Sequence, residues 1–211
     1  MTDIAVFAAH PHLSQSRVTR ALLDAARGAD PSRVTVRDLY ALYPDYWIDI
    51  QAEQAVLSRA RLVVWLHPIH WYSMPPLMKL WLDEVFAFGW AYGPEGHALR
   101  GKDLWLAVST GGPASSYRPD GYNRYFFDDF LHAYDQTAAL TGMRMLPPMV
   151  LHGAHRVSAS DLQEHAAVFA NRLATYPAWP ELAALGPTIE CTVPADARPA
   201  ESADEDGPNP L

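Results

Sequence analysis

The sequence predicts an α/β fold, an open parallel sheet of five strands with helices on both faces. Short runs of almost only apolar residues, typical of strands buried on both faces, lie at 4–9, 62–66 and 104–108. Segments with helical spacing of apolar residues alternate with such runs along the chain. This alternation favours a parallel sheet, because a helix returns the chain to the same edge between consecutive parallel strands.

The first hundred residues are expected to hold three strands and three helices. A strand at 4–9 leads to a helix over 17–27, and a short strand at 34–36 leads to a helix over 53–60. After the strand at 61–66, Pro76 suits the first turn of a third helix, where its missing N–H costs no hydrogen bond. We expect the buried side of that helix to consist of Leu77, Leu80, Trp81, Val85 and Phe88.

The second half is expected to add two strands and two helices. After the strand at 104–108, a helix over 125–140 precedes a strand over 145–151. Pro147 and Pro148 place that last strand at an edge of the sheet, because proline has no N–H to give to a neighbouring strand.

The last helix and the segment after it set the domain boundary. A helix over 160–174 is expected to use Ser160 as its N-cap, with Gln163 completing a capping box. Beyond it the chain becomes acidic, alanine-rich and punctuated by proline. We therefore expect one domain over 1–176 and a proline-rich acidic tail over 177–211 that is largely disordered.

Composition excludes several classes of protein. The net charge is −8, and no lysine run or basic patch is present, so nucleic acid is not an expected partner. The only cysteine, Cys191, rules out an internal disulfide and fits a reducing compartment. There is no leader-like start and no run of about 18 apolar residues, so we expect a cytoplasmic protein.

The most informative segment follows the third expected strand. Residues 67–76 crowd two imidazoles and a Trp-Tyr pair into a loop that a double proline ends. In an open α/β sheet ligands bind at the carboxyl ends of strands. These rings could instead fill a core, but buried polar tips each need a partner. A planar cofactor such as a flavin is the favoured interpretation.

The loop over 10–17, after the first strand, predicts an anion site. Its hydroxyl groups, the N–H groups of a helix start and Arg17 together suit a phosphate. A capped helix with a solvated arginine is an equally good interpretation of this segment alone. The pairs His10/His12 and His152/His155 could ligate a metal, but no further ligands have suitable spacing, so no metal site is predicted.

The loop over 110–117, after the fourth expected strand, carries Gly111 and Gly112. Paired glycines let the backbone approach a flat ligand and direct its N–H groups at it, although a plain turn would also use them. Its position beside the loop over 67–76 in the predicted topology favours the ligand.

These three loops resemble those of the flavodoxin-like NAD(P)H:quinone oxidoreductases. Within that family, the chain is most similar to the FMN-binding ancillary proteins of glutathione-regulated potassium-efflux systems. The resemblance runs from about Ile4 to Tyr176. It rests on His10-Pro11, Leu39-Tyr40, Tyr43-Pro44-Asp45 with Ile48-Asp49-Ile50, Trp65-x-His67-Pro68, Trp71-Tyr72-Ser73-x-Pro75-Pro76-Leu77-x-Lys79-Leu80-Trp81, Gly89-Trp90-Ala91-Tyr92-Gly93 and Thr110-Gly111-Gly112.

The resemblance implies a flavodoxin-like sheet of order 2-1-3-4-5 that binds FMN, or FAD as a second choice. The phosphate would lie against the first loop, at His10, Ser14, Ser16 and Arg17. The ring would lie against Pro68, Ile69, His70, Trp71, Tyr72, Ser109, Thr110, Gly111, Gly112 and Tyr117. Arg17 departs from the small polar residue of the family, but a guanidinium can also clamp a phosphate.

The same resemblance implies groups that stabilise the reduced flavin. Larger FAD enzymes of the family place a tyrosine and a histidine after the double glycine. Tyr117 matches the tyrosine, whereas Asn123 stands where the histidine would be. Asparagine can donate a hydrogen bond but cannot become cationic. The expected catalytic set is therefore Tyr117, Gly111, Gly112 and Asn123.

The implied activity is two-electron reduction of a quinone or a similar electrophile. NADH or NADPH would give hydride to flavin N5 and leave before the acceptor binds. The alternative is a regulatory subunit of a potassium-efflux antiporter, held at the inner face of the membrane through that partner. A flavodoxin-type electron carrier ranks last, because the long aromatic loop suits substrates better than protein docking.

Two aromatic segments, 86–92 and 125–127, predict a homodimer in which each partner roofs the other's active site. Packing of these rings within one subunit is the other possibility.

Overall fold

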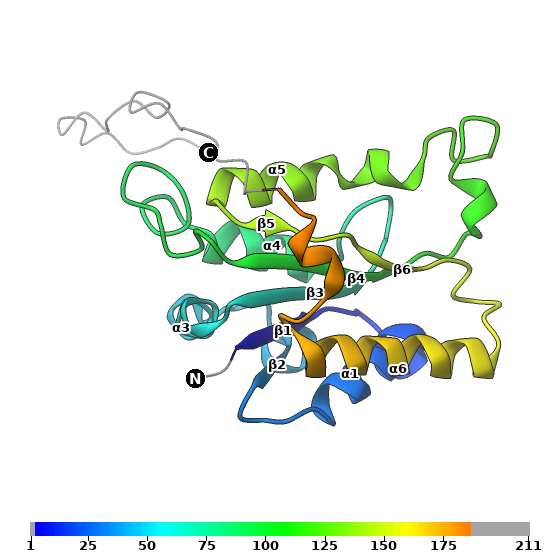
Figure 1. The fold of residues 1–211 in the computed structure, drawn as a ribbon, viewed down its shortest axis with the longest axis horizontal. Helices are drawn as coiled ribbons and strands as arrows, with labels where there is room; N and C mark the ends of the chain where they lie inside the picture. The colour runs from blue at the N-terminus through cyan, green and yellow to red at the C-terminus, as the bar shows by residue number, and fades with distance from the viewer. Residues whose placement is uncertain (1–2, 187–211) are drawn as a thin grey trace.

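The computed structural model describes residues 3–186 and confirms the predicted fold. A parallel sheet has the order β2-β1-β3-β4-β5, with β6 also paired to β4 (Figure 1). Its strands are β1 (Ile4–Ala8), β2 (Val34–Asp38), β3 (Leu62–Pro68), β4 (Asp103–Ser109), β5 (Arg144–Met145) and β6 (Met149–Leu151).

The expected fifth strand is split into β5 and β6. Both pieces pair with β4, Leu104 facing Met145 and Ala107 facing Met149. Pro147 and Pro148 lie between them. Since proline cannot donate to the neighbouring strand, the pairing breaks at Pro147 and Pro148 and resumes at Met149. The edge position was predicted, but the interruption was not.

Helices cover both faces of the sheet. They are α1 (Val18–Arg27), α2 (Leu39–Leu42), α3 (Ile50–Arg59), α4 (Pro76–Val85), α5 (His132–Thr141) and α6 (Ala159–Thr175). Short 3-10 turns are η1 (Leu13–Gln15), η2 (Ala114–Ser116), η3 (Phe127–Leu131) and η4 (Pro180–Ala183). In Figure 1, α1 and α6 lie side by side on one face of the sheet, and α4 and α5 lie on the other.

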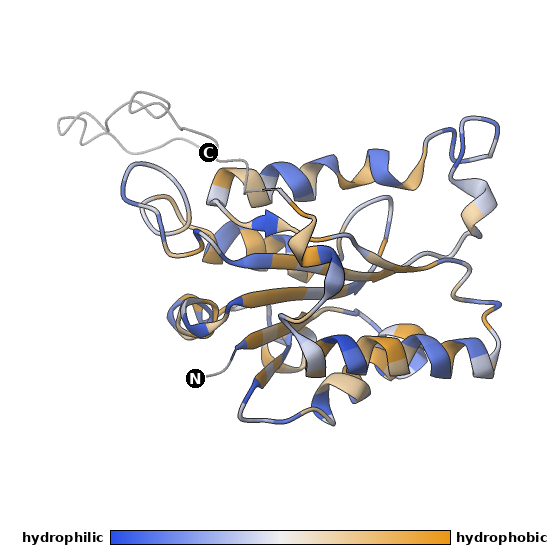
Figure 2. Ribbon diagram, viewed as in Figure 1, coloured by the Kyte–Doolittle hydropathy of each residue, from blue (hydrophilic) through white to orange (hydrophobic). Residues whose placement is uncertain are grey.

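Alternation along the central strands creates two cores. In β3, Val63 and Trp65 pack with Trp81 and other residues of the α4–α5 face. Val64, between them, packs on the α1–α6 face with Leu22. All of these side chains are buried, and Figure 2 shows apolar residues concentrated in the central strands. The sheet is therefore a rigid layer that fixes where its loops begin.

Two expected helix starts are wrong. The helix expected over 125–140 begins only at His132, because 127–131 form the 3-10 turn η3, entered where the Phe126 N–H donates to Asp129 Oδ2 at 2.8 Å. The last helix is capped by Ser158, not Ser160, since Ser158 Oγ accepts the Asp161 N–H at 3.0 Å.

Two further boundaries also differ. The helix expected from residue 53 starts at Ile50, because Asp49 Oδ1 accepts the Ala52 N–H at 2.9 Å and caps it. The helix α4 ends at Val85, so Phe88 lies beyond it and is 45% exposed instead of joining the buried side.

The packed region continues past Tyr176. Trp179 is 5% exposed, its ring lies 4.9 Å from that of Trp105, and its Nε1 donates to the Arg172 carbonyl at 2.9 Å. Residues 177–186, which we assigned to the tail, thus pack on the domain. The rest of the expected tail, with Cys191, lies outside the described residues.

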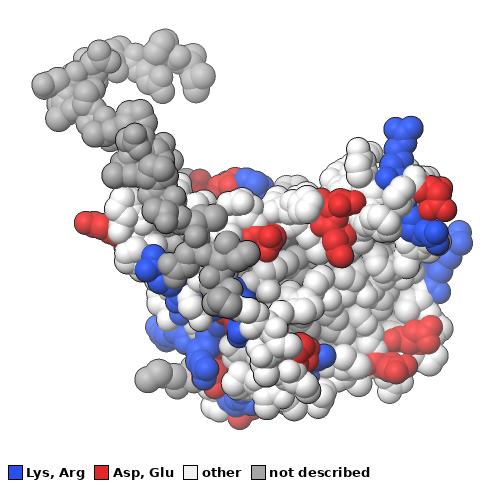
Figure 3. Space-filling view, turned by 45° about the horizontal axis from the view of Figure 1, so that its top comes forward, with Lys and Arg blue, Asp and Glu red and all other residues white. Residues whose placement is uncertain are grey.

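The helices and surface charges set simple limits. Between residues 3 and 186, no helix combines the length and apolar character that a membrane crossing requires. On the face drawn in Figure 3, Lys and Arg side chains gather in two places, at the lower left and the upper right, each with Asp or Glu side chains nearby, and a broad uncharged area lies between them. This face therefore carries no extended field of one sign.

Candidate functional site

Three loops meet at the carboxyl edge of the sheet. They follow β1, β3 and β4, as the sequence predicts. Backbone hydrogen bonds hold their starts together: the Ala9 N–H donates to the Leu66 carbonyl at 2.9 Å, and the Ile69 N–H donates to the Ser109 carbonyl at 2.8 Å. The parallel register fixes these loops at one edge.

A cavity of about 430 Å³ lies between the three loops. Nine of the expected binding residues line it: His10, Ser16, Arg17, Pro68, Ile69, His70, Ser109, Thr110 and Gly111. Five further residues line it that were not predicted as binding residues: His12, Gln15, Val18, Ala154 and His155. We call this the edge cavity.

The first loop presents a guanidinium and a helix start to the edge cavity. Ser16 Oγ accepts the Thr19 N–H at 3.1 Å and so caps the first turn of α1. The Arg17 side chain is exposed and makes no hydrogen bond or ion pair with any described residue. Ser14 does not line the cavity, and its carbonyl accepts a bond from Arg20 at 3.2 Å. Arg17 is therefore available to an anion.

Imidazoles surround the same cavity. The rings of His10 and His70 lie edge to face, 5.8 Å apart. Burial, followed by the neighbouring imidazoles, lowers the pKa of both rings below the usual 6.5. They are neutral at pH 7, so the fixed positive charge of the cavity is that of Arg17. Among the described residues, no group of three or more His, Cys, Asp or Glu side chains is placed to hold a metal ion.

The second loop is strained at its tip. Trp71 and Tyr72 have φ of 48° and 65°, in the left-handed region, which costs about 1–3 kcal/mol for each non-glycine residue. His70 and Ser73 exchange backbone hydrogen bonds of 2.9 and 3.0 Å across this tip. Strain of this kind clusters at functional sites. The structure does not place either ring in the lining of the edge cavity.

The two rings have different surroundings. Trp71 is 93% exposed. The Tyr72 ring stacks on Phe130 with 4.9 Å between centroids, and its hydroxyl donates to Asn123 Oδ1 at 3.3 Å. Tyr72 is thus held in place, whereas Trp71 stands at the rim.

The glycines of the third loop lie close to the tips of two exposed side chains, those of Tyr122 and His155. A Cβ on Gly112 would lie 2.5 Å from the Tyr122 hydroxyl oxygen, and one on Gly111 would lie 3.3 Å from His155 Nε2. The Thr110 hydroxyl donates to the Gly112 carbonyl at 2.8 Å and fixes the turn. Gly112 lines a second, larger cavity instead of the edge cavity.

Tyr117 ends this loop, and Asn123 follows it in the chain. Tyr117 is 8% exposed and packs edge to face on Phe127 at 5.4 Å. Burial raises its pKa, so its hydroxyl keeps its proton at neutral pH. Asn123 is also 8% exposed. Neither residue lines the edge cavity.

The chain matches the model of a known protein family. The family described by the flavodoxin-like fold covers residues 2–173. The chain belongs to this family. The resemblance inferred from the loop motifs is thereby confirmed, and the match ends near the carboxyl end of α6.

Two relatives of this flavodoxin-like protein are described, one by its part in a potassium-efflux system and the other by its complex with FMN. The glutathione-regulated potassium-efflux system ancillary protein KefF of Citrobacter koseri is 44% identical over 178 residues, covering 84% of this chain and 97% of the relative. The structure of general stress protein 14 of Treponema denticola, in complex with FMN, is 38% identical with a TM-score of 0.76 and covers 82% of this chain and 98% of its own.

A third relative adds a description of activity. A Klebsiella pneumoniae structure described as a candidate quinone reductase is 28% identical with a TM-score of 0.72, covering 84% of this chain and 86% of its own. Each description applies to the protein that carries it.

Proposed function

We propose that this flavodoxin-like protein is an FMN-dependent NAD(P)H:quinone oxidoreductase. When bound, FMN would supply a ring that takes a hydride from the reduced nicotinamide and gives it to a quinone. The observation that carries the proposal is the edge cavity, which joins an unpaired guanidinium to the three loops of a flavodoxin-like sheet. Similarity to an FMN complex and to a candidate quinone reductase supports it.

The first loop fits the phosphate of FMN. Arg17 would contribute a charge-assisted contact, and Ser16 and His10 would contribute polar atoms beside the positive end of α1. The His10 Nδ1 accepts the His12 N–H at 3.1 Å, so the neutral ring carries its proton on Nε2 and can donate from there. FAD is the second choice, because FMN carries one phosphate and FAD carries two, and the first loop offers a single phosphate site.

The other two loops fit the ring. Ile69 and Pro68 offer an apolar wall to the flavin ring. The N–H groups of Gly111 and Gly112 would point at the edge of the ring on which negative charge develops when the flavin is reduced. The protonated Tyr117 hydroxyl and the Asn123 amide would help to stabilise the negative charge on the same edge of the flavin ring. We propose that Trp71, at the rim, covers bound substrate, with Tyr72 as its fixed neighbour.

Assembly and location follow as parts of the proposal. Within segments 86–92 and 125–127, Phe86 and Phe127 are buried in the subunit, whereas Tyr125 and Phe126 are more than half exposed. We propose a cytoplasmic homodimer in which these exposed rings meet the partner near the active site.

The test is flavin content and turnover of the purified protein. We expect a yellow protein with one FMN per chain and ping-pong reduction of menadione by NADH or NADPH. A protein that binds no flavin, or that reduces no menadione with either nicotinamide, would falsify the proposal.

A second function, regulation of a potassium-efflux antiporter, is favoured by the 44% identity to KefF. It does not exclude turnover. Full flavin occupancy with negligible menadione reduction, together with stimulated efflux in vesicles that hold the antiporter, would support this function over the enzyme.

A further inference from the structure

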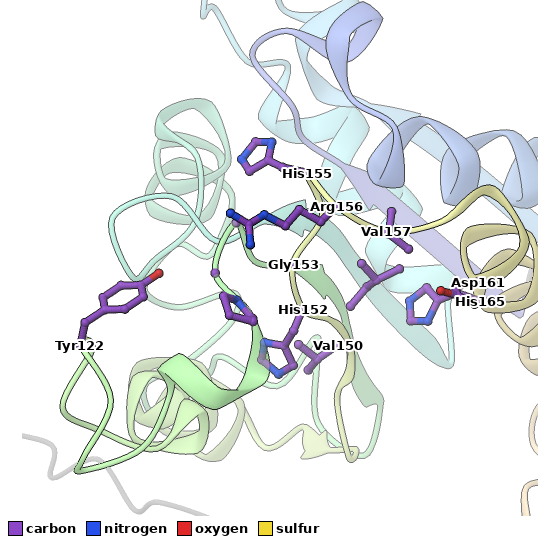
Figure 4. Close-up of a pocket in the computed structure, with 13 residues that line it drawn as sticks. Tyr122, Val150, His152, Gly153, His155, Arg156, Val157, Asp161 and His165 are labelled. Atoms are coloured by element: carbon purple, nitrogen blue, oxygen red, sulfur yellow. The ribbon is translucent and has the colours of Figure 1, made fainter.

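A second cavity opens beside the edge cavity. It has a volume of about 880 Å³ and lies between the glycine loop after β4, the loop after β6 and the start of α6. Gly111 and His155 line both cavities and form their common wall. Figure 4 shows its side chains arranged around this space, which we call the α6 cavity.

The α6 cavity holds an unpaired cation next to that wall. The Arg156 guanidinium makes no hydrogen bond or ion pair with any residue from 3 to 186. In Figure 4 it lies between the rings of His155 and Tyr122. Phosphate groups would therefore be favoured close to the common wall.

The far end of the α6 cavity has a different character. Asp161 and His165 lie together there, away from Arg156 and Tyr122 (Figure 4). His165 Nε2 is buried and has no hydrogen-bond partner among the described residues. Val157 adds an apolar surface. A carboxylate accepts hydrogen bonds from sugar hydroxyls, and an imidazole beside an apolar side chain can meet a heteroaromatic base.

The order of Arg156, Asp161 and His165 along the α6 cavity matches the order of phosphates, ribose and base in one half of a dinucleotide. A ligand entering past Gly111 and His155 would meet first the guanidinium, then the carboxylate and the imidazole. We propose that the α6 cavity binds the adenosine diphosphate half of the reduced nicotinamide dinucleotide, with Arg156 on its phosphates and Asp161 on its ribose. The inference rests on the proposed function and names a site for its co-substrate.

Cavity sizes agree with this division. The edge cavity, at about 430 Å³, would take the mononucleotide, and the reductant needs room for its second half outside the ring stack. The α6 cavity is the larger of the two and shares a wall with the first, so the nicotinamide could reach the ring while the adenosine half stays behind His155.

The experiment measures ADP binding to the FMN-loaded protein by calorimetry, which needs no turnover. For Arg156→Ala we expect ADP to bind about tenfold more weakly, the loss of one charge-assisted contact. Arg156→Lys should recover part of the affinity. The KM for the nicotinamide dinucleotide should rise about as much, with kcat at saturation and FMN affinity unchanged. Arg156 is exposed, so these variants should fold.

Arg118→Ala is the matched control. Arg118 is an exposed arginine paired with Asp120 at 3.2 Å and lies outside the cavity lining, so ADP binding should not change. Equal ADP binding by Arg156→Ala and wild type would overturn the inference, as would loss of FMN in place of ADP. Failure of ADP to bind alongside active menadione reduction would refute this site and leave the reductase standing. Arg156-dependent ADP binding without any menadione reduction would support the site and refute the reductase.

Discussion

The two edges of the sheet use arginine in opposite ways. At the amino edge, Arg144 at the start of β5 binds Asp103 at the start of β4 through Nε at 2.8 Å and Nη2 at 3.1 Å. The same carboxylate accepts the Tyr176 hydroxyl at 2.8 Å. At the carboxyl edge, Arg17 and Arg156 each line a cavity and have no partner among the described residues.

This difference distinguishes an arginine that stabilises the fold, Arg144, from two arginines that are available to a ligand, Arg17 and Arg156. Asp103 is 5% exposed, and its bonds satisfy groups that would otherwise be buried without a partner. Among residues 3–186, no hydrogen bond or ion pair holds the side chain of Arg17 or Arg156. Substitutions at the amino edge should therefore change stability, and those at the carboxyl edge should change binding.

The largest effect is expected from Asp103→Ala. Losing the carboxylate leaves Arg144 and the buried Tyr176 hydroxyl without their acceptor, which should cost about 3 kcal/mol of unfolding free energy. Urea denaturation measures it. Asp120→Ala removes an exposed pair and should cost less than about 1 kcal/mol. Equal losses for the two variants would break the distinction between the edges.

The next largest effect is a loss of stability at acid pH, which we expect from the buried histidine His67. Burial lowers the pKa of His67, in β3, to about 4, against about 6.5 in the unfolded chain. The unfolded chain binds more protons between these values, so stability falls as the pH drops from about 6.5 towards 4. We expect a loss of about 2 kcal/mol near pH 5 from this group.

The variant His67→Gln isolates that contribution. Urea denaturation at several pH values should show a shallower acid loss for His67→Gln than for the exposed control His132→Gln. The same acid loss in both variants would show that His67 gains no proton on unfolding in this range.

A smaller effect is expected from Arg17→Ala, on ligand affinity. FMN should bind about tenfold more weakly through loss of one charge-assisted contact, while the unfolding free energy of the apo-protein stays within about 0.5 kcal/mol. Flavin fluorescence titration measures the affinity. Arg20→Ala, on the same helix but outside the cavity, is the control. A destabilised Arg17→Ala protein would mean that this arginine is structural after all.

The smallest effect is expected from Trp71→Gly. Glycine accepts the positive φ without strain, and little packing is lost from a residue that is 93% exposed, so stability should rise by up to about 1 kcal/mol. The KM for menadione should rise, because the rim loses its ring. Tyr72→Gly should instead lose stability with its Phe130 contact. A stability loss at Trp71 would contradict the strain argument.

Much of the fold could be predicted because the central strands are buried on both faces. Ile4–Ala8 and Leu62–Leu66 read as apolar runs whatever surrounds them. The predictions failed where two residues close together in the sequence could play the same structural role. Two serines could cap α6, and the cap is Ser158 because its Oγ accepts the Asp161 N–H.

The site was predictable where it adjoins those strands. Pro68, Ile69 and Ser109 lie at strand ends, so their position follows from the strand register. His155 and Ala154 come from the loop after β6, the strand that prolines interrupt, and reach the cavity only through tertiary packing. The signal that could have found them was the His152-x-x-His155 pair, which we considered only for metal binding.

The most direct test of the central claim is a crystal structure of the protein grown with FMN. We predict that the phosphate lies within hydrogen-bond distance of Arg17 and Ser16, and that the ring lies against Ile69 and Gly111. A flavin whose phosphate lies on Arg156 in the α6 cavity, with Arg17 still free in solvent, would contradict it.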